Sequence, residues 1–212
     1  MSITRTLLVA LLLATGLVAC VAPPREVPLF ARAQLATDFD TYAIRRVGLL
    51  PVRIPITDGG AHVSQSDYLQ GWLASQVELG SPYEVIELAE ADLVDLPPLD
   101  PRRSGRHEVE TVLGLSQRFA LDALLVVEIT DQQPYPPQRI AAHAELVACE
   151  TGATIWTGNV QLDARDVRVR DGLEIYARRD VGMGDGADRW DVILLSPRRF
   201  AEFAMWQLAQ ML

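Results

Sequence analysis

The sequence has 212 residues, a formal net charge of −9 and a hydrophobic fraction of 49%. A chain of this length and composition can bury one sizeable globular core. Its acidity argues against nucleic acid as a partner, because that binding depends largely on neutralising phosphates. The chain has no lysine, which excludes a P-loop lysine and a Schiff-base lysine.

Residues 1–19 are predicted to be a secretory signal peptide. Arg5 is their only charge, and the apolar run that follows is too short to span a bilayer comfortably. The segment closes on Leu17-Val18-Ala19-Cys20, which resembles the lipobox of bacterial lipoproteins. That resemblance implies an acylated (palmitate-bearing) Cys20 as the mature N-terminus. The alternative is an ordinary signal peptide with an accidental cysteine.

Val21 and Ala22 follow the cysteine where aspartate would oppose sorting to the outer membrane. The resemblance therefore implies an outer-membrane anchor with the domain facing the periplasm. Residues 20–44 are predicted to be a lipidated N-terminus and proline-rich tether, and residues 45–212 a single periplasmic domain. Without Arg5 the charge becomes −10. Cys149 then has no internal partner and is predicted to be a buried, inert thiol.

Three strand-like segments between residues 120 and 163 form the predicted centre of the fold. The run Ala123–Ile129 is apolar throughout, as in a strand buried on both faces. The segments 140–148 and 154–163 instead alternate with period two, which places one face on a core and the other toward water. Trp156 falls on the inward face, and Gly152 supplies the glycine that a tight hairpin needs.

Helices and further strands are predicted on both sides of this centre. A strand at 47–50 precedes a helix from Ser66, as cap, to Gly80, and a strand at 82–88 follows. The next helix, 107–120, turns Val109, Val112, Leu113 and Phe119 inward. After the central strands come a helix at 166–180 and a last helix starting at Ser196-Pro197. The order β-α-β-α-β-β-β-α-α predicts a mixed α/β domain, with helices on a sheet of about five strands.

This order of elements resembles a small periplasmic α/β domain found in several bacterial envelope lipoproteins. The group includes the curli-secretion lipoprotein, the Pel exopolysaccharide lipoprotein, LpoB and the N-terminal domain of TolB. The turn Thr151-Gly152 followed by Ile155-Trp156 matches the commonest form of one hairpin in that group. The resemblance covers roughly residues 45–212. It implies assembly, scaffolding or activation in the envelope through oligomers or protein partners.

Candidate catalytic residues are few. His62, His107 and His143 have no carboxylate or cysteine beside them at ligand spacing, and Ser116 lacks the second glycine of a nucleophile elbow. Asp185, Asp188 and Asp191 alternate with glycines, which suits either a solvated loop or a calcium ion, although EF-hand spacing is absent. The sequence therefore predicts no enzyme, no cofactor and no metal.

Two stretches are candidate interaction surfaces. The segment 131–139 is too proline-rich to continue a sheet, so it is predicted to leave the body as an extended loop that presents Tyr135, Pro136 and Pro137. A plain connector is the alternative. The helix at 166–180 carries Arg168, Arg178 and Arg179, which could meet an anionic glycan or an acidic partner. The alternative there is a solvated face balanced by neighbouring aspartates.

These observations predict a non-enzymatic outer-membrane lipoprotein that acts in cell-envelope assembly. It would be a scaffold or accessory of a secretion, polysaccharide-export or peptidoglycan-synthesis machine, with protein partners or self-association. A periplasmic enzyme or ligand-binding lipoprotein, with a site formed only in the fold, is the alternative. A passive structural lipoprotein is a third possibility.

Overall fold

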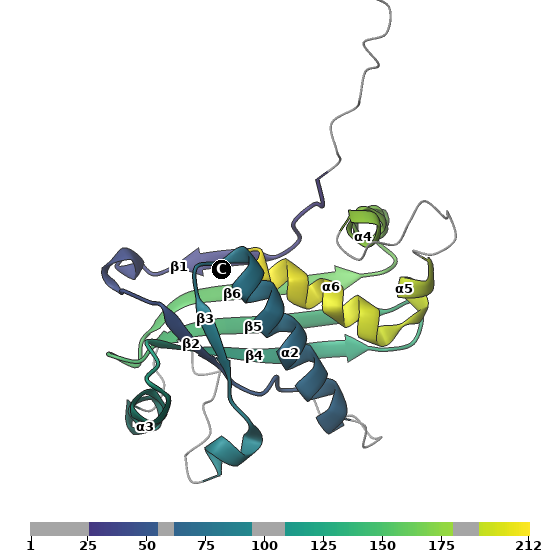
Figure 1. The fold of residues 1–212 in the computed structure, drawn as a ribbon. Coiled ribbons are helices and arrows are strands. Elements are labelled where there is room, and N and C mark those ends of the chain that lie inside the picture. Colours follow the sequence, from purple (N-terminus) through teal and green to yellow (C-terminus); the bar gives the residue numbers. More distant parts are fainter. Residues whose placement is uncertain (1–25, 55–61, 95–108, 180–190) are drawn as a thin grey trace, which may run out of the picture.

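The computed structural model of the chain describes residues 26–54, 62–94, 109–179 and 191–212, and everything below refers to them. Six strands form one mixed sheet in the order β1-β6-β5-β4-β2-β3 (Figure 1). The strands are β1 (Arg32–Leu35), β2 (Arg46–Leu49), β3 (Glu84–Glu87), β4 (Ala123–Gln133), β5 (Arg139–Ala148) and β6 (Thr154–Asp163). The predicted α/β class is confirmed, with one strand more than the expected five or so.

The sheet combines an antiparallel half and a parallel half. Along the order β1-β6-β5-β4, each strand is antiparallel to the next. The strands β4, β2 and β3 run parallel to one another. Parallel neighbours need crossover connections, which contain the helices α2 (His62–Gly80) and α3 (Val109–Phe119). Two short 3₁₀ helices, Phe39–Thr41 and Glu90–Leu93, lie in connecting segments.

The three predicted central strands are confirmed as β4, β5 and β6, although residues 144–148 of β5 are buried on both faces, where alternation predicted one face toward water. Every residue from Ala123 to Ile129 is buried, as expected of a strand covered on both faces. β5 and β6 pair along their length, and the turn between them has Gly152 at φ 67°, a conformation that glycine adopts without steric cost.

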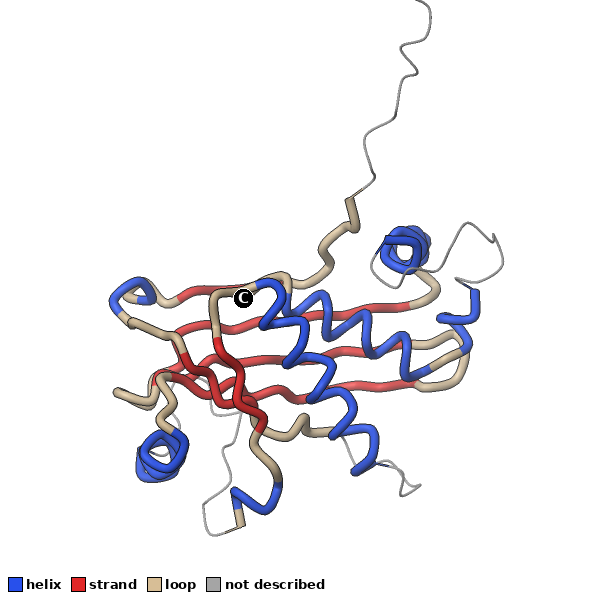
Figure 2. The backbone as a smooth tube through the Cα atoms, in the orientation of Figure 1, coloured by secondary structure: helices blue, strands red, loops and turns tan. Residues whose placement is uncertain are grey.

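Two hydrophobic clusters lie on opposite faces of the sheet. On β4, Leu125 belongs to the larger cluster and its neighbours Leu124 and Val126 to the smaller, because successive strand residues point to opposite faces. The larger cluster includes residues of α2, α4 (Val167–Arg179) and α6 (Pro197–Ala209), and the smaller one residues of α3. Figure 2 shows α2 and α6 crossing the same face of the strands.

The last helix is more deeply buried than its pattern predicts. Ser196 caps α6 as expected, accepting a hydrogen bond from Arg199 N at 3.4 Å, and Pro197 occupies the first turn. All residues from Phe200 to Ala209 are buried, including Glu202 and Gln207. The short helix α5 (Asp191–Leu195), which the sequence did not predict, precedes it.

Part of the predicted tether belongs to the domain. Residues 32–35 form strand β1, which pairs antiparallel with β6 at the edge of the sheet. Just before β1, the fully buried Gln207 accepts a hydrogen bond from Phe30 N at 2.7 Å and donates one to Pro28 O at 3.0 Å. The segment before β1 has no apolar periodicity, and it is held in place because its backbone bonds to the side chain of Gln207, which is distant in the sequence.

Two helix details differ from prediction. α2 begins at His62, so Ser66 is not its cap; the Ser66 hydroxyl instead donates to Val52 O at 2.6 Å. On α3, Val112 is buried as expected, but Val109 and Leu113 are 42% and 45% exposed, while Thr111 and Leu115 point inward. The inward stripe of α3 is therefore rotated from the predicted one.

Trp156 lies on the inward face of β6, as predicted, and is only 2% exposed. Its indole N–H donates to Met211 O at 3.0 Å. The ring lies over Gly158, where a Cβ atom would overlap it. Glycine at that position therefore makes the room that the indole fills.

Candidate interaction site

The β4–β5 hairpin ends in a short, braced loop rather than in a long extended one. The two strands remain paired as far as Gln133 and Arg139, so the prediction that residues 131–139 leave the sheet is wrong. The reason is the position of the prolines: they occupy residues 134, 136 and 137, beyond the last paired residues, where no ladder hydrogen bond is lost. We call residues 134–138 the hairpin tip.

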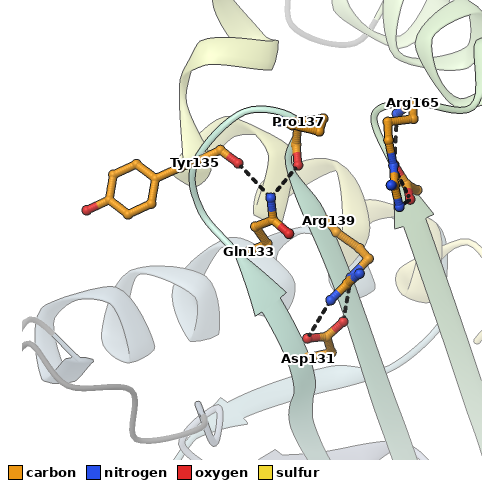
Figure 3. Close-up of polar contacts among 7 residues, drawn as sticks. Asp131, Gln133, Tyr135, Pro137, Arg139 and Arg165 are labelled. Atoms are coloured by element: carbon orange, nitrogen blue, oxygen red, sulfur yellow. Dashed lines mark hydrogen bonds and ion pairs between the residues drawn. The ribbon is translucent and has the colours of Figure 1, made fainter.

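Tyr135 is presented at the hairpin tip. Its side chain is 78% exposed and points away from the body of the protein (Figure 3). The Gln133 amide donates to Tyr135 O at 3.4 Å and to Pro137 O at 3.1 Å, which bridges the loop from within. Pro136 and Pro137 are also exposed. The tip therefore offers an aromatic ring and proline surface on a restrained backbone.

Ion pairs flank the hairpin tip at the same end of the sheet. Arg139 Nε lies 2.7 Å from Asp131 Oδ2, and Arg165 pairs with Asp163 at 2.6 Å (Figure 3). Hydrogen bonds from Arg165 hold the pKa of Asp163 down, at about 2. Asp163 is thus ionised over the physiological range, and each of the two acids pairs with its arginine.

The predicted arginine surface on α4 is largely balanced by acids. Arg168 pairs with Asp166 at 2.8 Å, and Arg178 pairs with Glu174 at 2.5 Å. Arg179 is the last residue of α4. An anionic glycan or acidic partner would have to compete with these carboxylates.

A polar cluster on the sheet was missed by sequence reasoning. His143 and Glu145 of β5 lie on one face, with the His143 Nε2 atom 3.0 Å from Glu145 Oε1 and Nδ1 2.8 Å from Asn159 Oδ1. Glu145 is only 1% exposed and also accepts a hydrogen bond from the Thr154 hydroxyl at 3.3 Å. The statement that His143 has no carboxylate beside it is therefore wrong. The i,i+2 spacing on a strand, which puts two side chains on one face, was the available signal.

This arrangement engages both nitrogens of the imidazole. The hydrogen bond to Glu145, with smaller effects from Asn159 and Glu128, raises the pKa of His143 despite its partial burial. An imidazole that donates to both oxygens is the protonated form. The geometry suits a structural ion pair inside the sheet better than an acid or base that needs a free nitrogen.

The other candidate nucleophiles are also engaged or buried. Burial raises the pKa of the Cys149 thiol to about 11, so the thiol form dominates at neutral pH. The Ser116 hydroxyl donates to Leu121 O at 2.8 Å. His107, Asp185 and Asp188 lie outside the described residues, and His62 and Asp191 begin α2 and α5.

A second buried carboxylate lies between α2 and α6. Glu202, 1% exposed, accepts a short hydrogen bond from the Tyr68 hydroxyl and pairs with Arg199 at 2.9 Å. The Arg198 guanidinium stacks 3.2 Å from the centre of the Tyr68 ring. Burial, and then the bond to Glu202, raise the pKa of Tyr68. This cluster joins two helices of one layer.

Metal-binding clusters and membrane-spanning helices are absent from the described part of the chain. Within it, no three His, Cys, Asp or Glu side chains gather as a metal site. Nor does any described helix have the length and apolar character to cross a bilayer.

An open hollow of about 780 Å³ lies between the segment before β1, the end of β6 and the start of α4. Leu29, Arg32, Asn159, Gln161 and Arg168 are among its lining residues.

No protein-family model and no curated protein sequence matches the chain. Solved structures similar to it include the PelC dodecamer from Paraburkholderia phytofirmans, at 11% identity and a TM-score of 0.43, covering 80% of this chain and 96% of that one. Lipoprotein GNA1162 from Neisseria meningitidis is 15% identical with a TM-score of 0.42, covering 66% and 98%. The LpoB C-terminal domain from Salmonella enterica is 14% identical with a TM-score of 0.36, covering 56% and 83%. Two proteins named in the sequence resemblance are thus among these structures.

Proposed function

We propose that the chain is a non-enzymatic lipoprotein of the bacterial outer membrane whose periplasmic domain binds protein through the hairpin tip. It would act as a scaffold or accessory in a secretion, polysaccharide-export or peptidoglycan-synthesis machine. The partner is another envelope protein or a further copy of the chain. The lipobox-like segment ending at Cys20 supports the anchor, and the hairpin tip supports the binding role.

The observation that carries the binding role is the restrained exposure of Tyr135. The ring is 78% exposed, while the Gln133 amide and the prolines fix the backbone that bears it. A rigid aromatic loses little conformational entropy on binding, and tyrosine is enriched among residues that dominate interfaces. Elsewhere, His143, Ser116 and Cys149 are held in structural contacts or in the inactive thiol form, which supports a non-enzymatic role.

Tyr135→Ala is expected to weaken complex formation severalfold without loss of the fold. Because the ring lies in solvent, the free energy of unfolding should change by less than about 0.5 kcal/mol. Crosslinking and sizing of the detergent-extracted protein measure the association, and thermal melting measures the fold.

Leu79→Ala is the matched control for Tyr135→Ala. Leu79 is 82% exposed near the end of α2, where Gly80 lies beside Gln210 at the end of α6, whereas the hairpin tip lies beside Pro197 at the start of α6. Its removal should leave association unchanged. Equal association of wild type and Tyr135→Ala would eliminate the hairpin tip as the binding surface.

Cys20→Ala tests the anchor separately. Without an acylated cysteine the protein should move from the membrane to the soluble periplasmic fraction and lose labelling by a palmitate analogue. Acyl chains provide this retention, at about 0.8 kcal/mol for each buried CH₂ group. Unchanged membrane fractionation together with an unlabelled wild type would contradict the anchor.

A further inference from the structure

The chain enters the domain beside α4. Val27 and Ala31 are buried, and Gln207 holds the backbone of Pro28 and Phe30. Pro28 and the Phe30 ring pack against Gly172 of α4, so closely that a Cβ atom there would lie 2.9 Å from each. Figure 1 shows the segment leaving the sheet next to α4. A fixed point of the domain therefore lies on its α4 side.

Little chain separates this fixed point from Cys20. Val27 is only seven residues after Cys20, and seven residues span at most about 25 Å when fully extended. The strands themselves are longer: β5 has ten residues, or about 33 Å. A lipid on Cys20 therefore keeps the α4 side near the bilayer, while α3, at the other end of the strands, can lie much farther away.

The surface nearest this entry point combines exposed apolar side chains with arginines. Leu29 is 51% exposed and Val167 is 55% exposed. The side chains of Arg165 and Arg168 are 67% and 79% exposed, whereas their partners Asp163 and Asp166 are 28% and 35% exposed. The guanidinium groups therefore lie outermost. Leu29 and Arg168 line the same hollow, which places them together in space.

We infer that Leu29, Arg165, Val167 and Arg168, here named the anchor-side surface, lie against the phospholipid headgroups of the membrane that holds Cys20. This inference rests on the proposed lipidation. Arginine suits the position, because its stem covers apolar surface while its planar guanidinium binds phosphate. Exposed ion pairs are weak, so Arg165 and Arg168 can exchange carboxylate for phosphate at little cost.

The charge of the chain does not oppose this orientation. The mature protein carries −10 and is repelled by anionic lipids as a whole. Residues 163–179 are an exception, with five arginines against four acidic residues. Because salt screens charges beyond about 8 Å, headgroups near this stretch interact with its local charge rather than with the net charge of the whole chain.

Hydroxyl-radical footprinting tests the anchor-side surface. Acylated protein is reconstituted in phosphatidylethanolamine–phosphatidylglycerol nanodiscs and compared with soluble Cys20→Ala protein. Oxidation of Leu29 and Val167 should fall severalfold on the membrane, while that of Leu113, on α3, should stay the same. Equal oxidation of Leu29 and Val167 in the two samples would overturn the inference.

Substitution separates orientation from anchoring. Arg165→Gln combined with Arg168→Gln should abolish the protection of Leu29 and Val167 while leaving the protein bound to nanodiscs. The matched control is Arg118→Gln on α3, since Arg118 is also exposed and paired, with Asp92 at 3.2 Å. Retained protection in the double variant would show that the arginines do not hold the surface.

Failure of the lipid anchor itself is distinguishable. If the wild type does not co-purify with lipid, the proposed lipidation is at fault. The anchor-side surface is then tested with a hexahistidine segment preceding residue 20 on nickel-chelating lipid. Protection of Leu29 and Val167 there would support the surface, and its absence would refute it.

Discussion

Glu145 is a carboxylate inside a sheet, and its neighbours explain how the fold tolerates it. At 1% exposure an ionised carboxylate is costly unless it is paired and hydrogen-bonded. His143 provides an opposite charge at 3.0 Å, and the Thr154 hydroxyl provides a further bond. The cost of the buried acid therefore depends on the protonation of one imidazole.

This dependence predicts how stability varies with pH. The ordinary pKa of histidine is 6.5, and contact with Glu145 raises that of His143 in the folded protein. A raised folded pKa gives stability that is complete below about pH 6.5 and is lost as the pH rises through the folded value. His143→Gln removes this contribution and should cost about 1.5–3 kcal/mol at pH 6, the worth of a hydrogen bond to a charged group.

Urea unfolding of wild type and His143→Gln between pH 5.5 and pH 9 measures the effect. The difference in free energy of unfolding should narrow as the pH rises. Asn159→Ala is a useful comparison, because it removes the weaker of the two ring contacts and leaves the charge pair. A difference that is constant across the range would mean that His143 does not titrate in this window.

At the scale of elements, the position of β1 depends on a helix that is distant from it in the sequence. β1 has only four residues, and the segment before it is fixed by Gln207 of α6, 177 residues from Phe30. We call the hydrogen bonds of Gln207 to Phe30 N and Pro28 O the Gln207 clamp. The clamp holds the residues just before β1, and the pairing with β6 holds β1 itself. Loss of the clamp should therefore loosen β1 before it affects β4, β5 or β6.

Gln207→Leu tests the clamp with a side chain of similar size. The backbone groups of Pro28 and Phe30 lose their partner, so the free energy of unfolding should fall by about 1–3 kcal/mol. Amide hydrogen exchange should accelerate at residues 30–35 and stay slow in β5. Gln207→Glu keeps an acceptor for Phe30 N but places an unpaired carboxylate, fully buried, against Pro28 O, so it should destabilise the fold at least as much as Gln207→Leu. Unchanged exchange at residues 30–35 in Gln207→Leu would contradict the clamp.

For the molecule as a whole, local sequence patterns predicted most of the strands and helices, whereas elements fixed by long-range contacts were not predicted. Apolar runs and period-two alternation located β4, β5 and β6, and a serine–proline pair located the start of α6. β1 escaped prediction because its pairing with β6 and its support from Gln207 involve distant residues. A strand of four residues is too short for its hydrophobic periodicity to indicate such contacts.

The candidate sites show a similar division. Proline content indicated that Tyr135 lies in a loop, but pairing up to Gln133 and Arg139 follows from the length of the two strands. The His143–Glu145 contact was readable from strand spacing, whereas its bond to Asn159 needed the register with β6. The proximity of Leu29 to Arg168 depends on three-dimensional packing alone.

The contact between Trp156 and Gly158 has a consequence for how this sequence can vary. The indole occupies the volume that a side chain at position 158 would need, and its N–H holds Met211 O. The two positions therefore cannot be substituted independently, since a larger residue at position 158 requires a smaller one at position 156. Any homologue that keeps this strand should show them changing together, as a covarying pair two residues apart.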